Sequence, residues 1–385
     1  MIDSVAQIGR QTILMYRGTI SRFEVFGTAG VFLAILLGLC LSFERGLPII
    51  PCVGVAIFLI CFFTLSMLTV KIVSGNVTLV FYRYSLLMLV AETMTLRLLY
   101  LPVLPLLDIT VVAIGLFLGF GRVGCFSVGC CHGRPCRWGV CYGSEQVRTG
   151  FPSWLAGVRL FPVQALEALW VLCLALVGTI WLLHGPVSGS VFAFYTVAYG
   201  SGRFFIEFLR GDEGRPHLFG FSEAQWTSVV LVGGMVLAES WHLLPKQFFP
   251  LPVFKFLLTS LFIIAFLRAM RRSTSHAFFS AKHINEVARA LIFLQAPAIT
   301  SMDVFGAPGA TPIQVVCTSE GLKISLGRIR RFNRSLVHFS LSSERSPLSA
   351  KDAKSLARII GYLCGSAVSF RVVAGASGVF HAVGG

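Results

Sequence analysis

The chain is poor in charged residues: only 13% of its 385 residues are Asp, Glu, Lys or Arg. Soluble domains ordinarily carry about 25%, so this composition excludes a chain that is a water-soluble globule throughout. The chain is instead 55% hydrophobic, and its long apolar runs fall within residues 25–270, while the remainder has ordinary polarity. This division predicts a membrane-embedded body followed by a soluble tail.

Features that would indicate other classes of protein are also missing. No small-residue cleavage site follows the first apolar stretch, so we expect no cleaved signal peptide. The net charge of +15 could suggest a nucleic-acid partner, but basic residues also collect in the cytoplasmic loops of membrane proteins. The tail has no aromatic residues interleaved with its basic ones that would stack on bases. We therefore predict no nucleic-acid partner.

The apolar runs predict the fold class, because a helix that crosses a bilayer needs roughly 20 mostly apolar residues. Eight stretches qualify: 25–43, 48–71, 77–100, 104–121, 162–184, 187–209, 226–244 and 250–268. The third and the eighth contain charged residues, so we expect an all-α polytopic membrane protein with seven or eight transmembrane helices. The distribution of Lys and Arg leaves its orientation open.

The tail is expected to form a separate small α+β domain, 273–385, of unknown role, after a membrane domain 1–272. A capping box at Ser349 and Asp352 predicts the start of one helix. The other expected elements are a helix near 280–294 and strands at 312–318, 322–327, 335–341 and 367–374.

The first motif lies where a span meets a long polar stretch, and it runs from Gly121 to Pro135. Its glycines allow a close approach of the backbone to a ligand. Arg122 and Arg134 supply planar guanidinium groups that suit phosphate oxygens. A tight helix–loop junction with snorkelling arginines is the alternative.

The second motif runs from Tyr199 to Asp212 at the end of another span. Arg203 and Glu207 are four residues apart, so they share a helix face and can pair, and Arg210 follows one turn later. Charges at the end of a membrane span are costly and usually functional. A structural ion pair is the alternative.

The third motif, residues 161–168, opens a span with a proline and places Gln164 and Glu167 one turn apart. A buried hydrogen-bonding pair would explain it equally well.

The cysteines are concentrated in the polar stretch, in the pattern C-x4-C-C-H-x3-C-x4-C. The six residues of this pattern are Cys125, Cys130, Cys131, His132, Cys136 and Cys141. The spacing is not that of a zinc ribbon. Disulfides that brace the loop or simple packing are the favoured interpretations, ahead of a metal site and of a thiol that relays an acyl group. We therefore predict no cofactor.

Four segments together carry a family resemblance: GRVGCFSVGCCHG, FPVQALEAL, YGSGRFFIEFLRGD and FSEAQW. In order and spacing they resemble the prolipoprotein diacylglyceryl transferases, over roughly residues 10–245. The resemblance implies a bacterial inner-membrane enzyme that moves the diacylglyceryl group of phosphatidylglycerol to the lipobox cysteine of a prolipoprotein. A thioether forms and glycerol phosphate leaves.

The resemblance also implies roles for individual residues. The expected catalytic residues are Arg122, Arg203, Glu207 and Tyr82, with Tyr82 in the place of the family's histidine. The expected substrate-binding residues are Gly121, Gly124, Gly133, Arg134, Gln164, Tyr199 and Arg210.

The chain departs from the family pattern at several positions. Cys125 stands in place of an asparagine and Cys130 in place of a glutamate, while Phe161 and Leu166 replace a histidine and a tyrosine. Two other hypotheses therefore remain: a non-catalytic phospholipid-binding scaffold, and a metal or redox protein that uses the cysteine-rich loop.

Overall fold

The computed structural model describes residues 21–74, 81–270, 275–295, 314–331, 334–345, 347–365, 370–375 and 378–384. The chain forms two compact units. The helical unit comprises Met1–Cys130, Val163–Phe208 and Pro216–Ile263, and the mixed unit comprises Cys131–Pro162, Leu209–Arg215 and Ile264–Gly385. The mixed unit thus combines the polar stretch and a short segment that includes the end of the second motif with the C-terminal part of the chain.

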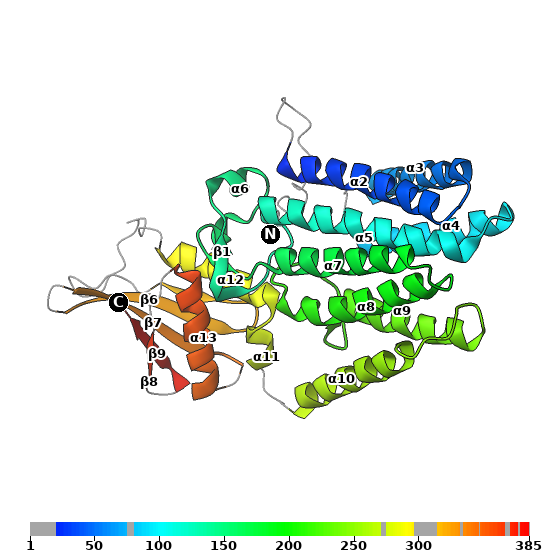
Figure 1. Ribbon diagram of the computed structural model, residues 1–385. Coiled ribbons are helices and arrows are strands. Elements are labelled where there is room, and N and C mark those ends of the chain that lie inside the picture. The colour runs from blue at the N-terminus through cyan, green and yellow to red at the C-terminus, as the bar shows by residue number, and fades with distance from the viewer. Residues whose placement is uncertain are drawn as a thin grey trace. The chain divides into compact units, whose positions relative to one another are not determined.

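The long helices occupy the eight apolar stretches that the sequence predicts (Figure 1). Their bounds are α2 (Arg22–Glu44), α3 (Ile49–Ser74), α4 (Phe81–Leu98), α5 (Val103–Val128), α7 (Val163–Leu183), α8 (Ser190–Ile206), α9 (Glu223–Ser240) and α10 (Pro250–Met270). A short hairpin of β3 (His217–Leu218) and β4 (Phe221–Ser222) precedes α9.

Within the described residues, five of these helices, α2, α3, α5, α7 and α10, are long and apolar enough to cross a membrane. The chain is therefore a multi-pass membrane protein. A count of seven or eight spans stays a prediction, because α8 has only 17 residues and α4 includes Arg83, Glu92 and Arg97.

Helix α5 lies at the centre of the helical unit, with α2, α4, α7 and α8 packed against it. Glycines allow these helices to approach closely. A Cβ added at Gly119 of α5 would lie 2.4 Å from Leu172 of α7, and one added at Gly202 of α8 would lie 2.1 Å from Trp170. The bundle is therefore held together by backbone proximity as well as by apolar side chains.

Acidic side chains inside the bundle have polar partners. Glu92 of α4 is buried and accepts a hydrogen bond from Thr110 of α5 at 2.6 Å. Asp108 accepts hydrogen bonds from the backbone N–H groups of Gly189 at 2.6 Å and Phe192 at 2.7 Å, so it caps the start of α8. Glu92, one of the charged residues that interrupt the third predicted span, is thus directed into the bundle.

The polar stretch of the mixed unit is ordered, as its composition predicts. Strand β1 (Pro135–Cys141) pairs with β2 (Arg159–Leu160), and α6 (Ser144–Arg148) and the short helix η1 (Ser153–Leu155) lie between them. Trp154 donates a hydrogen bond to Asn285 at 2.9 Å. Asn285 belongs to α12 (Ala281–Gln295), which follows α11 (Ser275–Phe278).

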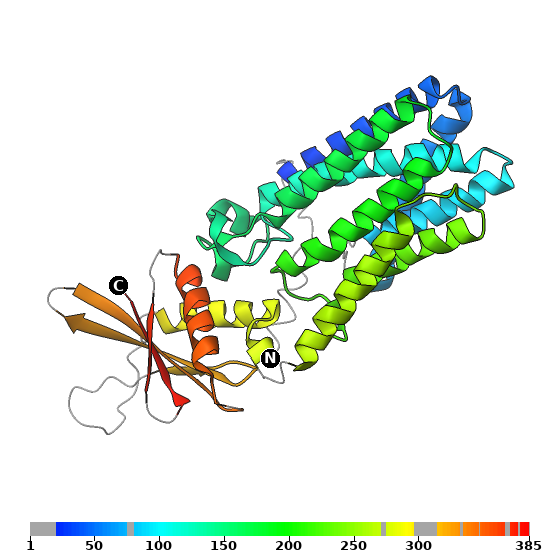
Figure 2. The same cartoon turned by 60° about the horizontal axis from the view of Figure 1, so that its bottom comes forward.

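The rest of the mixed unit is an antiparallel sheet in the order β5-β6-β7-β9-β8. The bounds are β5 (Val315–Cys317), β6 (Leu322–Arg331), β7 (Arg334–Ser343), α13 (Ala350–Leu363), β8 (Arg371–Ala374) and β9 (Phe380–Gly384). Alternate residues such as Ile324 and Leu341 enter one core with α12 and α13, which cover one face of the sheet (Figure 2). The predicted cap at Ser349 is confirmed, whereas β9 was not predicted.

Candidate active site

Three helix ends meet at one end of the helical unit: the last turns of α5, the first two turns of α7, and the end of α8 with the short helix η2 (Glu207–Leu209) that follows it (Figure 1). They bring together four charged side chains, which we call the buried charge cluster: Arg122, Glu167, Arg203 and Glu207. Arg122 Nη2 lies 3.1 Å from Glu167 Oε1, and Arg203 Nε lies 3.8 Å from the same oxygen. Arg203 Nη2 lies 2.7 Å from Glu207 Oε2, so the predicted pair of the second motif is confirmed.

The cluster contains two cations and two anions, and its side chains are nearly inaccessible. The exposed fractions are 12% for Arg122, 1% for Glu167, 5% for Arg203 and 4% for Glu207. Charges buried to this degree are tolerated only when they are paired. Within the described residues, Arg203 Nη1 is buried and has no hydrogen-bond acceptor. Arg203 therefore keeps hydrogen-bonding capacity that its two carboxylate partners do not use.

Glu167 is the member that the sequence did not single out for the site. The third motif suggested only a polar pair with Gln164, but the structure makes Glu167 the carboxylate that joins Arg122 to Arg203. A glutamate at the start of an otherwise apolar helix was the available signal, because such a charge is costly unless it has a role.

The fourth segment, FSEAQW, supports the end of α8. Ser222 and Gln225 form a capping box at the start of α9: Ser222 Oγ accepts from the Gln225 N–H at 3.3 Å, and Gln225 Oε1 accepts from the Ser222 N–H at 3.0 Å. The Nε2 group of Gln225 also donates to the carbonyl of Phe204 at 3.3 Å. This motif therefore fixes the α8 turn that carries Arg203.

Other predicted site residues of the helical unit have structural contacts. Gln164 donates to the carbonyl of Cys130 at 2.8 Å, and the ring of Tyr199 stacks on Tyr195 with centroids 6.1 Å apart. A Cβ at Gly124 would lie 3.1 Å from Phe23, so this glycine permits close packing of α2 and α5.

The two remaining residues of that unit contribute less to the geometry. Open space surrounds the position where a Cβ would stand at Gly121. Tyr82 lies in α4, but its side chain falls outside the described part of the chain. The catalytic role of Tyr82 stays a prediction.

The mixed unit joins the ends of all three motifs through their backbones. The N–H of Gly133 donates to the carbonyl of Phe161 at 3.1 Å, and the N–H of Gly211 donates to the carbonyl of His132 at 3.0 Å. A Cβ at Gly133 would lie 2.4 Å from the Phe161 carbonyl oxygen, and one at Gly211 would lie 2.4 Å from that of Gly133. Only glycine permits this approach.

The arginines of the mixed unit are held by this framework. Arg134 Nε donates to the carbonyl of Arg210 at 3.2 Å, and Arg210 Nε donates to Asp212 Oδ1 at 3.0 Å. Arg215 also donates to Asp212, at 2.8 Å. Burial alone would raise the pKa of the Asp212 carboxyl, but Arg210 and Arg215 hold that pKa below its ordinary value.

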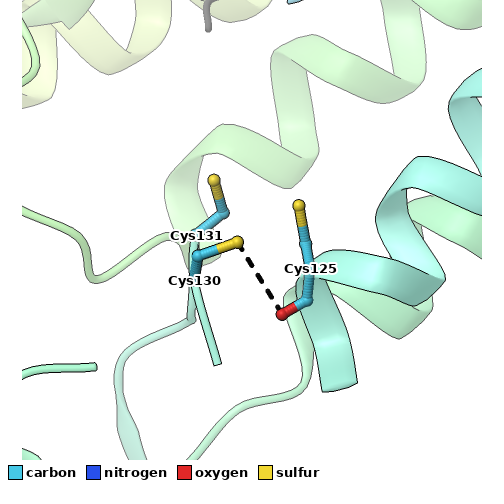
Figure 3. A group of neighbouring side chains, drawn as sticks. All are labelled: Cys125, Cys130 and Cys131. Carbon is cyan, nitrogen blue, oxygen red and sulfur yellow. Dashed lines mark hydrogen bonds between the residues drawn. The ribbon is translucent and has the colours of Figure 1, made fainter. Parts of the chain in front are cut away.

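The cysteine pattern separates into two parts. The sulfur atoms of Cys125, Cys130 and Cys131 lie within 4.8 Å of one another (Figure 3). The other three members of the pattern lie outside this group: Cys136 donates to the Trp138 carbonyl at 2.8 Å, Cys141 is exposed, and His132 Nδ1 lies 2.9 Å from the carbonyl oxygen of Gly133.

Comparisons with known proteins identify the part of the chain that carries these motifs. Residues 79–241 match the family model described as prolipoprotein diacylglyceryl transferase. The phosphatidylglycerol–prolipoprotein diacylglyceryl transferase of Clostridium tetani is 35% identical over 132 residues, which are 34% of this chain and 50% of that protein. Transferase 2 of Clostridium perfringens is 33% identical over 138 residues, which are 35% of this chain and 51% of that protein.

A similarly named protein of Dehalococcoides mccartyi is 31% identical over 127 residues, which are 33% of this chain and 47% of that protein. The chain thus spans about half the length of the curated relatives it matches. The matched segment includes Arg122, Glu167, Arg203 and Glu207 and the four motif segments in their order. Residues 79–241 of this chain are therefore similar to the prolipoprotein diacylglyceryl transferases.

Proposed function

We propose that this protein transfers the diacylglyceryl group of phosphatidylglycerol to the cysteine thiol of a lipobox-containing prolipoprotein in the bacterial inner membrane. The buried charge cluster carries the proposal. Its two guanidinium groups lie at the end of a helix bundle that includes five candidate membrane spans.

The arginines suit the charge that develops in this reaction. The carbon–oxygen bond between the glyceryl group and the phosphate breaks, and the electron pair leaves with glycerol phosphate. A second negative charge therefore develops on the phosphate, and guanidinium donors in a dry site stabilise it more than water does. Arg122 and Arg203 supply these donors, and both Nη1 and Nε of Arg203 are buried without a hydrogen-bond acceptor among the described residues.

The carboxylates suit the other half of the reaction. The sulfur must lose its proton before or as it bonds to the glyceryl carbon. Glu207, whose Oε2 is 2.7 Å from Arg203 Nη2, is the proposed acceptor of this proton. Protonation of Glu207 also releases Arg203 toward the phosphate, so the cluster gains one anion as it loses another. The net charge of the cluster and the bound phosphate together is therefore the same before and after this step.

Glu167 is proposed as the residue that positions the two arginines. One oxygen of its carboxylate is 3.1 Å from Arg122 and 3.8 Å from Arg203. Gly121, Gly124, Gly133, Arg134, Gln164, Tyr199 and Arg210 stay as proposed substrate contacts, and Tyr82 as a proposed catalytic residue.

The test is transfer from labelled lipid to peptide. The full chain, purified and placed in vesicles of phosphatidylglycerol labelled in the diacylglyceryl moiety, is incubated with a lipobox peptide. We expect the peptide to acquire label with the wild type and with Arg97→Ala, which removes an exposed arginine of α4. We expect no label with Arg122→Ala or Arg203→Ala.

Folded wild-type protein that binds phosphatidylglycerol and transfers no label would contradict the proposal. That result would favour the non-catalytic lipid-binding scaffold. Equal loss of transfer in Arg97→Ala would show that the effect of the cluster variants is not specific to the cluster.

A further inference from the structure

Three sulfur atoms come together at the C-terminal end of α5, on one short continuous segment of the chain. Cys125 lies in the last turn of α5, and Cys130 and Cys131 lie in the turn that follows (Figure 3). All three Sγ atoms lie within 4.8 Å of one another. A tight turn does not require three thiols close together in space, so their proximity suggests a role beyond shaping the turn.

The backbone is shaped to produce this arrangement. Helix α5 ends at Gly129, which has a left-handed φ of 80°. Cys131 is also left-handed, with a φ of 55°, although it is not glycine. A non-glycine residue in this region is uncommon and costs conformational energy, and such residues cluster at functional sites. The two left-handed residues reverse the chain, so that Cys130 and Cys131 face back toward Cys125.

Neighbouring groups hold the turn in place. The thiol of Cys130 donates to the carbonyl of Cys125 at 3.8 Å. Gln164, in the first turn of α7, donates to the carbonyl of Cys130 at 2.8 Å. The position of Cys130 is thus fixed from its own helix end and from a second helix.

The sulfur separations suit a metal ion. Zinc–thiolate bonds are about 2.3 Å long, so tetrahedral geometry places two sulfur ligands about 3.8 Å apart. The observed upper limit of 4.8 Å requires a movement of only about 1 Å, which rotation of the cysteine side chains can supply. Soft sulfur ligands select zinc or monovalent copper over magnesium and calcium.

The charge balance is also favourable. Three thiolates and a divalent ion carry a net charge of −1, and Arg122 lies one helical turn before Cys125 on α5. Three protein ligands leave one coordination position for water or another ligand.

We propose that Cys125, Cys130 and Cys131 bind one thiophilic metal ion, for which zinc is the best candidate, through three thiolates. The thiols release protons as the ion binds. The ion would fix the α5 turn beside Arg122. This site is independent of the proposed lipid transfer.

The test measures metal on the purified full chain in detergent. The protein is stripped with a chelator, titrated with Zn²⁺, and analysed for bound zinc by mass spectrometry. We expect one zinc per chain in the wild type. In Cys125→Ser, Cys130→Ser and Cys131→Ser the affinity should fall more than about 100-fold, since even changes beyond the first ligands cost 10- to 100-fold. Cys136→Ser, which alters a cysteine outside the group, should bind as the wild type does.

A second measurement on the wild type does not depend on the folding of any variant. Titration with Cd²⁺ should produce a thiolate-to-cadmium charge-transfer absorption with an intensity that corresponds to three sulfur ligands. Absence of this band, absence of stoichiometric zinc, or equal loss in Cys136→Ser would overturn the proposal. A thiol count lowered by two would do the same, and would indicate a disulfide within the group.

Discussion

The role of Glu167 gives a quantitative prediction. Glu167→Gln preserves the shape of the side chain and removes one charge, which leaves two buried arginines with a single carboxylate. Removing one partner of a buried ion pair typically destabilises a protein by 3–5 kcal/mol. Glu167 is 1% exposed and contacts Arg122 at 3.1 Å and Arg203 at 3.8 Å. We therefore expect a loss of about 3–5 kcal/mol.

The assay is thermal unfolding of the full chain in detergent. At about 2 °C for each kcal/mol in a protein of this size, the melting temperature should fall by about 6–10 °C. Glu44→Gln is the matched control, because Glu44 lies exposed at the end of α2, and it should change the melting temperature by no more than about 1 °C, as surface substitutions do.

A double variant tests the mechanism of this loss. When Arg122→Met is combined with Glu167→Gln, only Arg203 and Glu207 remain charged, and they remain paired. The double variant should therefore be less destabilised than the sum of its single variants, by about 0.5–3 kcal/mol. A melting temperature for Glu167→Gln equal to that of Glu44→Gln, or strict additivity, would refute the role of Glu167 as the shared partner of both arginines.

Three further predictions concern other features. Arg203→Lys keeps the charge but loses the planar fork, so lipid-to-peptide transfer should fall at least about 100-fold; transfer within a factor of two of the wild type would contradict this role. Gly202→Ala introduces a Cβ only 2.1 Å from Trp170, so the melting temperature should fall by the equivalent of about 1–3 kcal/mol, whereas Gly234→Ala, where a Cβ would meet open space, should cause no comparable loss. Asp212 has a folded-state pKa below its ordinary value of 3.8, so its stabilisation is fully present above that value and is lost as the pH falls through the lowered pKa. The difference in melting temperature between wild type and Asp212→Asn should therefore be large near neutral pH and shrink at acid pH, and a difference that grows on acidification would reverse the assigned sign.

Local sequence determined the elements of this protein. A span needs only a long apolar run, so all eight long helices were predictable from hydropathy. The cap at Ser349 and the Arg203–Glu207 pair depend on residues three and four positions apart, and such contacts follow from helix geometry alone. Strand β9 was not predicted, and its pairing with both β7 and β8 depends on contacts with segments distant in sequence.

The tertiary structure decided which elements act together. Arg122, Glu167 and Arg203 are separated by tens of residues, and only the packing of α5, α7 and α8 shows that one carboxylate contacts both arginines. Backbone geometry likewise separated Cys125, Cys130 and Cys131 from the other cysteines of the pattern, because left-handed residues reverse the chain in a way that spacing does not reveal. Sequence determined the charges and the helices that carry them. The structure determined their partners, because a buried charge is stable only beside a group of opposite charge, and the fold decides which group that is.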